Sequence, residues 1–394
     1  MNNQQTKNPQ TKDPTAEILS YLKKLVSIST AYPPGDTSQV ASYLKDCLAS
    51  MGYTTDLYAR VAGMDNIVAT MGSGSPSLVF NVHVDTVDAG DLSLWAHSPL
   101  KATVEDGFVY GLGSANCKGS GAVQLWLANE IARRGGPRNG TVTFTFVTDE
   151  ESLGPDGMYF LRDQGIVKPD MLLLGAPTDN SLITAERGVL WVEIITNGKP
   201  AHAGQPEDGD NAILRMMRII DRINNEMSSR LSQRIEGDMR STMNIGKVQG
   251  GRNTNVVPSQ CIAQIDRRLL PSETVDQAFA ELVSIIESVG EPKEMVSVEK
   301  FRGTDGFNGD NSGPLVSALS QAILDATGTP ARYEAAIGVS DGRYFSNDGI
   351  EIVNFGPGIG SEGHASNESV SIESLTTSAL ILDQAFAALI GYSS

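Results

Sequence analysis

The chain has 394 residues, of which 40% are hydrophobic and 20% charged, and its formal net charge is −17. This composition is typical of a soluble globular protein, and the length exceeds what one hydrophobic core supports, so we expect two domains. The negative charge argues against nucleic acid or an anionic membrane surface as a partner.

No apolar run is long enough to span a bilayer, and the polar N-terminus lacks the apolar segment of a signal peptide. We expect residues 1–13 to form a disordered tail. Three cysteines, Cys47, Cys117 and Cys261, are too few and too scattered for a disulfide framework. These features predict a cytoplasmic protein.

The first part of the chain alternates helix and strand patterns. An amphipathic helix is predicted from Thr15 to Ile28, and a second follows the N-cap cluster Asp36-Thr37-Ser38 and stops at Gly52. Strands are then predicted at 54–61, 66–71, 78–84, 141–148 and 171–174, with helices at 119–134 and 156–163. This alternation predicts an α/β fold with a mostly parallel sheet and helices on both faces.

The pattern changes after about Ile183. Strands are predicted at 189–196 and 261–269, with helices at 211–226 and 274–289, which together suggest an inserted α+β domain. The alternation of helix and strand patterns returns after about Lys300, with a helix at 315–326, a strand at 350–355 and a final helix at 372–389. We therefore predict a discontinuous catalytic domain, 14–183 and 299–394, interrupted by an inserted domain over 184–298.

Two of the predicted strands end in residues that can bind metal. His83-x-Asp85 follows the apolar run 77–83, and Asp149-Glu150-Glu151 follows the run 141–148. In open α/β sheets, ligands and catalysis are found at the carboxyl ends of the strands. Imidazole and carboxylate are also the ligands of hydrolytic zinc sites. The sequence therefore predicts a metal-assisted amide hydrolase.

Further motifs occur in a consistent order along most of the chain. They are Trp95-x-x-x-Pro99, Gly111-x-Gly113 through Lys118-Gly119, Pro177-Thr178, His202-Ala-Gly-x-Pro206 with Asn211-Ala212-Ile213, Asn255-Val-Val-Pro258, Asp266-x-Arg268-x-x-Pro271, Ser340-Asp341-Gly342-Arg343 and His364-x-x-x-Glu368. This set resembles the M20 metallopeptidases, the group of acetylornithine deacetylase, succinyl-diaminopimelate desuccinylase, aminoacylase-1 and glutamate carboxypeptidase. The resemblance implies a zinc-peptidase-like fold, an inserted dimerisation or lid domain, a homodimer, and a small N-acyl amino acid or peptide-like substrate.

The resemblance also implies roles for the residues at the sheet edge. Members of the family hold two zinc ions about 3.5 Å apart. By this resemblance, His83 binds one ion, and Glu151 with His364 binds the other. Asp85 orients His83, as carboxylates behind ligating histidines commonly do. Glu150 is the general base that accepts a proton from the metal-bound water.

For the substrate, the resemblance implies that His202 reaches from the inserted domain, often across a dimer, to stabilise the oxyanion. Asn255, Arg268 and Arg343 would hold the substrate carboxylate, a task that suits the guanidinium fork. Each residue also has a simpler interpretation. Histidines and acidic pairs at strand and loop ends are often only solvated, and Arg268 can pair with Asp266. The joint order of the motifs favours the functional interpretation.

Two positions depart from the family pattern. The family has a metal-bridging aspartate where this chain has Asn116, and a second acidic ligand precedes Pro-Thr where this chain has Ala176. Two divalent ions carry four positive charges, which three carboxylates and a hydroxide offset in the family, whereas only Glu151 remains here as a ligand carboxylate. We therefore expect at most one weak site for zinc or another divalent ion, with Glu151 and His364 as its ligands and Asn116 as a weak third, or no ion at all.

A missing metal pair changes the expected chemistry. Metal binding lowers the pKa of water from 15.7 to about 7, so losing it forfeits roughly 12 kcal/mol of nucleophile activation. The chain is then interpreted as an M20-like amidase or deacylase scaffold with a depleted metal centre. The alternatives are metal-independent acyl transfer or amide formation, a non-catalytic binding protein, and a deliberately disabled variant of a dizinc hydrolase. Cys117 could act as a nucleophile, although a small buried hydrophobic side chain is its more common role.

Overall fold

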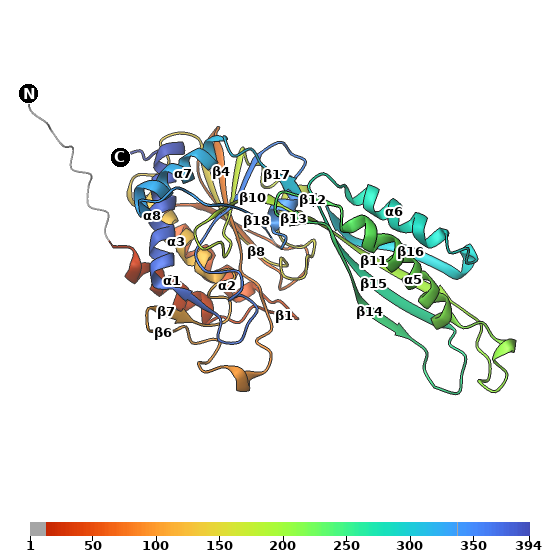
Figure 1. Cartoon of the computed structure of the whole chain (residues 1–394). Helices are drawn as coiled ribbons and strands as arrows, with labels where there is room; N and C mark the ends of the chain where they lie inside the picture. The colour runs from red at the N-terminus through yellow and green to blue at the C-terminus, as the bar shows by residue number, and fades with distance from the viewer. Residues whose placement is uncertain (1–12, 337) are drawn as a thin grey trace, which may run out of the picture. The chain divides into compact units, whose positions relative to one another are not determined.

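The computed structural model describes residues 13–336 and 338–394 (Figure 1). Residues 1–12 of the predicted disordered tail lie outside this part of the chain. The described residues form two compact units, the first from residues 13–184, Gly309–Glu334 and Ser340–Ser394, the second from Ala185–Asn308 and residues 335, 336, 338 and 339. In the described part of the chain, no helix combines the length and the hydropathy that crossing a membrane requires. The functional division into a catalytic and a dimerisation domain stays a prediction.

Unit 1 is built on a mixed sheet whose four central strands, in the order β19-β9-β4-β8, are parallel. Antiparallel strands flank them, because β3 pairs with β8, β2 with β3, and β10 with β19. Two short strands also pair with β10, namely β18 and β17, and the residues of β17 belong to unit 2. The strands are β2 (Thr54–Tyr58), β3 (Asn66–Gly72), β4 (Ser77–His83), β8 (Thr141–Val147), β9 (Met171–Leu174), β10 (Leu182–Glu186), β17 (Phe307–Asn308), β18 (Tyr333–Ala336) and β19 (Glu351–Asn354).

The two faces of this sheet have different coverings. Leu78, Phe80 and Val82 alternate along β4 and pack in one hydrophobic core with five helices. On the opposite face, the short helix η4 (Asp341–Phe345) contacts β9 and β19, and α4 (Met158–Asp163) packs on η4. The five helices of the first face are α1 (Thr15–Val26), α2 (Ser38–Ser50), α3 (Lys118–Arg133), α7 (Pro314–Thr327) and α8 (Ile372–Leu389).

Short strands complete unit 1. A parallel pair joins β1 (Ala31–Tyr32) to β5 (Thr86–Val87), and a small antiparallel sheet has the order β20-β7-β6. The small sheet joins two segments that are far apart in the sequence, since β20 (Ser369–Ser371) pairs with β7 (Phe108–Tyr110), which pairs with β6 (Thr103–Glu105). A turn of 3-10 helix, η1 (Leu92–Leu94), lies in the preceding loop.

Unit 2 is a four-stranded antiparallel sheet in the order β14-β15-β11-β16, with two helices packed on one face. Inward residues such as Leu190, Val192 and Ile194 alternate along β11, as expected for a sheet with one covered face. Its elements are β11 (Gly188–Asn197), η2 (Pro206–Asp208), α5 (Ala212–Leu231), β12 (Ile235–Glu236), β13 (Met239–Arg240), β14 (Thr242–Gly250), β15 (Gln260–Leu269), α6 (Val275–Glu287), η3 (Lys293–Met295) and β16 (Val296–Thr304).

The predicted fold class is confirmed, with corrections to individual elements. The first helix ends at Val26 rather than Ile28, and α5 continues to Leu231 rather than Glu226. The sheet of unit 1 is parallel only in its centre. Strands β10, β14 and β16, the pair β6-β7 and the other short strands were not predicted. β14 and β16 are largely exposed, with few apolar residues in alternation, so they lack the hydrophobic periodicity that identifies a strand.

Candidate active site

Two parallel neighbouring strands bring the predicted site residues to one edge of the sheet in unit 1. In the pairing of β4 with β8, His83 lies opposite Val147, so both strands end at the same level. The chain after β4 supplies Asp85, and the loop after β8 supplies Glu150 and Glu151. The prediction that these strands deliver their residues to one edge is therefore confirmed by the register.

Asp85 contacts both His83 and the loop that carries Glu151. His83 Nδ1 lies 3.1 Å from the main-chain oxygen of Asp85 and 3.5 Å from its carboxylate Oδ1. The other carboxylate oxygen, Oδ2, accepts a hydrogen bond of 3.1 Å from the backbone N–H of Glu151. The side chains of His83 and Asp85 are 6% and 2% exposed. This buried carboxylate therefore fixes the imidazole ring and the acidic loop together.

Glu150 lies between two basic side chains. Its Oε2 is 3.9 Å from His83 Nε2, and its Oε1 is 3.6 Å from Nη1 of Arg343, which comes from η4. Burial raises the pKa of Glu150 to about 8, the charges of Glu151 and Asp341 act in the same direction, and His83 and Arg343 oppose the rise. A carboxyl group of this kind can exchange a proton near neutral pH.

Arg343 is fully buried beside Glu150. Its Nη2 donates a hydrogen bond of 2.8 Å to the hydroxyl of Tyr344, which in turn donates to the main-chain oxygen of Gly154 at 2.9 Å. Nη1 makes no hydrogen bond among the described residues. The Arg343 guanidinium thus has one nitrogen directed at the site and another tied to the loop that carries Glu150. Tyr344 follows the Ser-Asp-Gly-Arg motif directly, but no sequence signal identified its role.

A second group of contacts surrounds Asn116. Its amide nitrogen lies 3.0 Å from Glu151 Oε1 and 3.0 Å from His364 Nε2, and these two partners are themselves 2.8 Å apart. The amide oxygen accepts a hydrogen bond of 2.7 Å from the thiol of Cys117, a residue that is 2% exposed. Asn116 and Cys117 are joined by a cis peptide bond. The structure therefore brings together Asn116, Glu151 and His364, as the sequence predicted.

Glu368 anchors the loop that carries Asn116. Its buried carboxylate accepts three backbone hydrogen bonds, from Gly113 at 2.7 Å and from Ala115 and Asn116 at 2.9 Å each. Burial raises the pKa of Glu368, while these hydrogen bonds oppose the rise. The sequence placed Glu368 in a motif without giving it a role. A carboxylate four residues after the predicted ligand His364 was the only signal available.

Ala176, the other departure from the family pattern, follows β9 and therefore lies at the same edge of the sheet. Its main-chain oxygen accepts a hydrogen bond of 3.0 Å from Thr178. A β-carbon at Gly356 would come within 2.6 Å of that oxygen, so the segment is closely packed. The methyl side chain of Ala176 offers no donor atom to a metal.

The remaining predicted residues lie in unit 2. His202 is exposed, its Nδ1 accepts a hydrogen bond of 3.0 Å from the backbone of Gly204, and its backbone forms a bridge with Val256. The backbone of Ala203 also bonds to Asn255 at 3.0 Å, so His202 and Asn255 lie on paired segments. Arg268 is on β15, where two nitrogens contact the Asp266 carboxylate at 2.8 and 3.0 Å.

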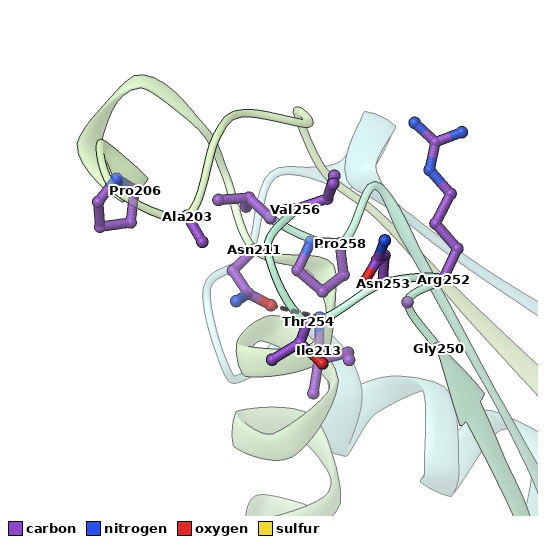
Figure 2. A pocket seen from close by; sticks show the side chains of 12 residues that line it. Ala203, Pro206, Asn211, Ile213, Gly250, Arg252, Asn253, Thr254, Val256 and Pro258 are labelled. Carbon is purple, nitrogen blue, oxygen red and sulfur yellow. Dashed lines mark hydrogen bonds between the residues drawn. The ribbon is translucent and has the colours of Figure 1, made fainter.

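A cavity of about 580 Å³ adjoins these paired segments (Figure 2). It lies at the beginning of α5, where the side chain of Asn211 caps the helix by accepting from Ile213 and Leu214. The lining includes Ala203 and Val256, the immediate neighbours of His202 and Asn255. Arg268 is not among the lining residues. The cavity was not predicted from the sequence.

Known proteins share this architecture. Residues 184–294 match the M20 peptidase dimerisation domain. The chain is 26% identical over 382 residues to a succinyl-diaminopimelate desuccinylase of Marinobacter nauticus, covering 94% of this chain and 97% of the relative. The M20 metallo-carboxypeptidase Sso-CP2 of Sulfolobus solfataricus superposes with a TM-score of 0.79 at 18% identity, covering 95% of this chain and 99% of that one.

A third similar protein is known to bind metal. The Bacillus subtilis YXEP protein, a dinuclear metal-binding M20 peptidase, superposes with a TM-score of 0.68 at 15% identity, covering 95% and 98% of the two chains. These matches support the assignment of the chain to the M20 peptidase family, and the similar structures show that it has the fold of M20 peptidases.

Proposed function

We propose that this M20 scaffold acts on the amide bond of a small N-acyl amino acid or a peptide-like molecule. The observation that carries the proposal is the buried Glu150 between His83 and Arg343, at the sheet edge where open α/β folds bind their ligands. A desuccinylase and a metallo-carboxypeptidase among the similar proteins support this substrate class. Glu150 is the proposed general base, and Asp85 positions His83 and the acidic loop.

In this proposal, the metal centre lacks the ligands that the family pattern places at positions 116 and 176. The amide nitrogen of Asn116 presents N–H groups to the space between Glu151 and His364, and an N–H donor cannot ligate a cation. Ala176 contributes no donor. The donors therefore do not fit a pair of ions such as the one in the dinuclear B. subtilis protein. At most one weakly held divalent ion, zinc or another, is compatible with the remaining set of His83, Glu151 and His364.

This depletion limits hydrolysis. Without a metal pair, roughly 12 kcal/mol of water activation is missing. A general base supplies a rate factor of about 10²–10⁴, which corresponds to roughly 3–5 kcal/mol. Glu150 can accept the proton of an incoming nucleophile, but it cannot replace the missing activation of water. We expect hydrolysis by the chain as it stands to be very slow.

A second candidate function is metal-independent acyl transfer, or amide formation. Two observations favour it. The pKa of Glu150 is raised to about 8, and Asn116 and Ala176 do not supply the metal ligands of the family pattern. In transfer from an N-acyl donor, the nitrogen of a neutral amine forms a bond with the acyl carbonyl carbon and its proton passes to Glu150. The bond between that carbon and the donor nitrogen then breaks, and Glu150 returns the proton to the departing amine. An amine is already nucleophilic at neutral pH, so no metal-bound hydroxide is required.

Substrate binding is proposed for Arg343, His202, Asn255 and Arg268. Arg343 offers its Nη1, which has no hydrogen-bond partner in the described residues, to a substrate carboxylate. His202 and Asn255 lie beside the cavity of unit 2. Arg268 can contribute only if it exchanges its present partner, Asp266, for substrate. A purely ligand-binding protein would use the same residues, and a deliberately disabled hydrolase would retain them.

We also propose a cytoplasmic homodimer. The dimerisation-domain match supports the dimer. Strand β14 is an edge strand that pairs only with β15 among the described residues, and such edges are prone to pair with another chain. On α5, Leu214 and Met217 are 51% and 58% exposed. The three cysteines are free thiols, which suits a reducing compartment.

The proposal is tested with a panel of N-acetyl, N-succinyl and other N-acyl amino acids and dipeptides. The parent chain and the double variant Asn116→Asp/Ala176→Glu are assayed with and without zinc, and the metal content is measured. Hydrolysis gained only by the double variant supports a depleted hydrolase. Metal-free amide formation by the parent chain, abolished by Glu150→Gln, supports the second candidate. Fast zinc-dependent hydrolysis by the parent chain contradicts the depleted centre.

A further inference from the structure

Large apolar side chains are exposed on unit 1 around η1 and the small sheet of β6 and β7 (Figure 1). Leu92 and Leu94 are 65% and 61% exposed, the highest values among the large hydrophobic residues of the described chain. Phe108, at the start of β7, is 41% exposed, and Leu100 and Val104, which lie between these residues in the chain, are 38% and 42% exposed. Single exposed apolar residues are ordinary, whereas several close together indicate an interaction surface.

Ring contacts join the loop after η1 to one face of the small sheet. The ring of His97, three residues after Leu94, lies 5.0 Å from that of Tyr110, which in turn lies 6.4 Å from the ring of Phe108. His97 Nε2 is also 2.9 Å from Oε2 of Glu105, which pairs directly with Phe108 across β6 and β7. The two segments therefore form one continuous surface. We call it the η1–β7 surface and define it by Leu92, Leu94, His97, Phe108 and Tyr110.

The loop that presents the two leucines is held in place by hydrogen bonds. The Asp91 side chain caps η1 by accepting from the backbone N–H of Ser93 at 2.9 Å. The Asn367 side chain accepts from the backbone N–H of Ala96 at 2.6 Å and donates to the main-chain oxygen of Leu94 at 2.9 Å. The leucines are thus exposed on an anchored loop. A preformed surface of this kind loses little conformational entropy when a partner binds.

Negative charge borders the η1–β7 surface. Lys101 is the only lysine or arginine between residues 88 and 110. The carboxylates of Asp88 and Asp91 accept hydrogen bonds from backbone N–H groups, and neither forms an ion pair among the described residues. The surface therefore combines exposed apolar side chains with uncompensated carboxylates, which complements apolar side chains flanked by lysine or arginine. The exposed acidic residues of this border are Asp88, Asp91, Glu105 and Asp106.

The same charges disfavour two other occupants. If two copies of the chain met through this surface, the symmetry of the contact would place the carboxylates of one copy against those of the other. Juxtaposed like charges cost several kcal/mol. An anionic lipid surface would be repelled for the same reason, and the net charge of −17 adds to this repulsion.

We propose that the η1–β7 surface docks a basic amphipathic segment of another protein. Apolar residues at helical spacing on this segment would contact Leu92, Leu94 and Phe108, and its lysines and arginines would face the bordering carboxylates. The proposal goes beyond the reaction at the candidate active site and does not depend on it. Asn367, which anchors the docking loop, follows His364 by three residues, so the docked segment would lie beside the loop that carries His364.

The experiment selects random peptides displayed on phage for binding to the full-length protein, with Leu92→Ser/Leu94→Ser/Phe108→Ser for counter-selection. We expect the enriched peptides to combine apolar residues at helical spacing with a net positive charge. An enriched peptide is then synthesised and titrated by calorimetry. The triple variant should weaken its binding by about tenfold or more, because buried apolar anchors dominate such contacts. Asp88→Asn/Asp91→Asn, which retains a capping oxygen, should weaken binding at low salt and have less effect at high salt.

Leu57→Ser/Leu324→Ser is the matched control, since these residues of unit 1 are 41% and 40% exposed and lie on other elements. It should change the affinity for the peptide by no more than about twofold. Thermal unfolding verifies that each variant is folded. The proposal is overturned if no peptide is enriched, if the enriched peptides are neutral or acidic, or if Asp88→Asn/Asp91→Asn binds as tightly as the parent chain at low salt.

Two further measurements examine the other occupants. Light scattering reports self-association of the parent chain and of the triple variant. Sedimentation with vesicles of phosphatidylcholine, with and without phosphatidylserine, reports lipid binding. We expect the triple variant to leave the mass of the protein unchanged and neither protein to bind vesicles. Self-association or vesicle binding by the parent chain that the triple variant abolishes would overturn the proposal in favour of a second copy or a membrane.

Discussion

Replacing Asn116 by aspartate should convert a stabilising contact into a repulsive one when no metal is present. In the parent chain, the amide nitrogen of Asn116 lies 3.0 Å from Glu151 Oε1. An aspartate places a second carboxylate oxygen close to the same position. Two unit charges at this separation repel by roughly 5 kcal/mol at an effective dielectric constant of about 20. His364, 2.8 Å from Glu151, offsets part of this repulsion.

We therefore expect metal-free Asn116→Asp to lose about 2–3 kcal/mol of unfolding free energy relative to the parent chain. Zinc should reverse the loss, because the new carboxylate completes a bridge that the parent chain lacks. A site filled at 100 times its dissociation constant stabilises the native state by about 2.7 kcal/mol. The assay is thermal unfolding by calorimetry, in chelator and across a zinc titration.

Asn116→Ala is the matched control for this substitution. It removes the hydrogen bond to Glu151 without adding charge, so it should cost only about 1 kcal/mol, and its response to zinc should be no larger than that of the parent chain. The reasoning fails if Asn116→Asp is as stable as the parent chain in chelator. It also fails if zinc stabilises all three proteins equally.

Three further predictions concern other parts of the chain. Glu368→Ala leaves three backbone N–H groups without their acceptor. It should therefore lower the free energy of unfolding, measured in urea, by about 3 kcal/mol. A variant as stable as the parent chain would show that the loop does not depend on Glu368. Burial of Glu281 opposes its ionisation, but hydrogen bonds from Arg234 and Arg230 lower its pKa from 4.5 to about 2. The contribution of Glu281 to the stability of the folded protein is therefore complete above pH 4.5 and is lost as the pH falls toward 2. Glu281→Gln should remove about 2 kcal/mol of this acid-dependent stability after allowance for solvent screening, which pH-dependent thermal unfolding measures against the parent chain. Leu214→Asp/Met217→Asp, on the exposed face of α5, should produce a monomer in light scattering if this face forms the dimer contact, and an unchanged mass would exclude it.

The sequence was sufficient to predict the meeting of His83 with Glu150 and Glu151. Each motif follows an apolar run of strand length, and parallel strands in a sheet end at a common edge. The shared edge follows from the parallel arrangement alone, whereas the direct contact between these residues also requires that β4 and β8 are neighbours, which the structure shows. The contacts of individual side chains within the site could not be predicted from the sequence. That Arg343 would be buried against Glu150 depends on η4 covering one face of the sheet, a contact between segments about 190 residues apart.

Strand β14 shows a different limit of sequence interpretation. Its segment, Thr242–Gly250, is largely exposed, with polar residues and two glycines, so it has neither hydrophobic alternation nor a continuous apolar run. Its position is determined by pairing with β15, whose alternating buried residues were recognised from the sequence. A strand that is defined by its neighbour rather than by its own pattern cannot be predicted from its own residues.

The orientation of Asn116 bears on the proposed depletion of the metal centre, because its amide contacts Glu151. Glu151 receives close contacts from both the Asn116 amide and the His364 imidazole, so its buried carboxylate is satisfied without an ion. An aliphatic residue at position 116 would have left Glu151 with one donor fewer, and unsatisfied buried carboxylates are destabilising. In the proposed depleted centre, an amide at position 116 in place of a carboxylate removes a ligand and supplies a hydrogen-bond donor at the same point. Meanwhile Glu368 still holds the loop of Asn116, and Asp85 still holds His83 and Glu151. The contacts that hold His83, Glu151 and Asn116 are thus present around a Glu151 carboxylate that is satisfied without an ion, whereas Oδ1 of Asp85 and Nη1 of Arg343 have no hydrogen-bond partner among the described residues.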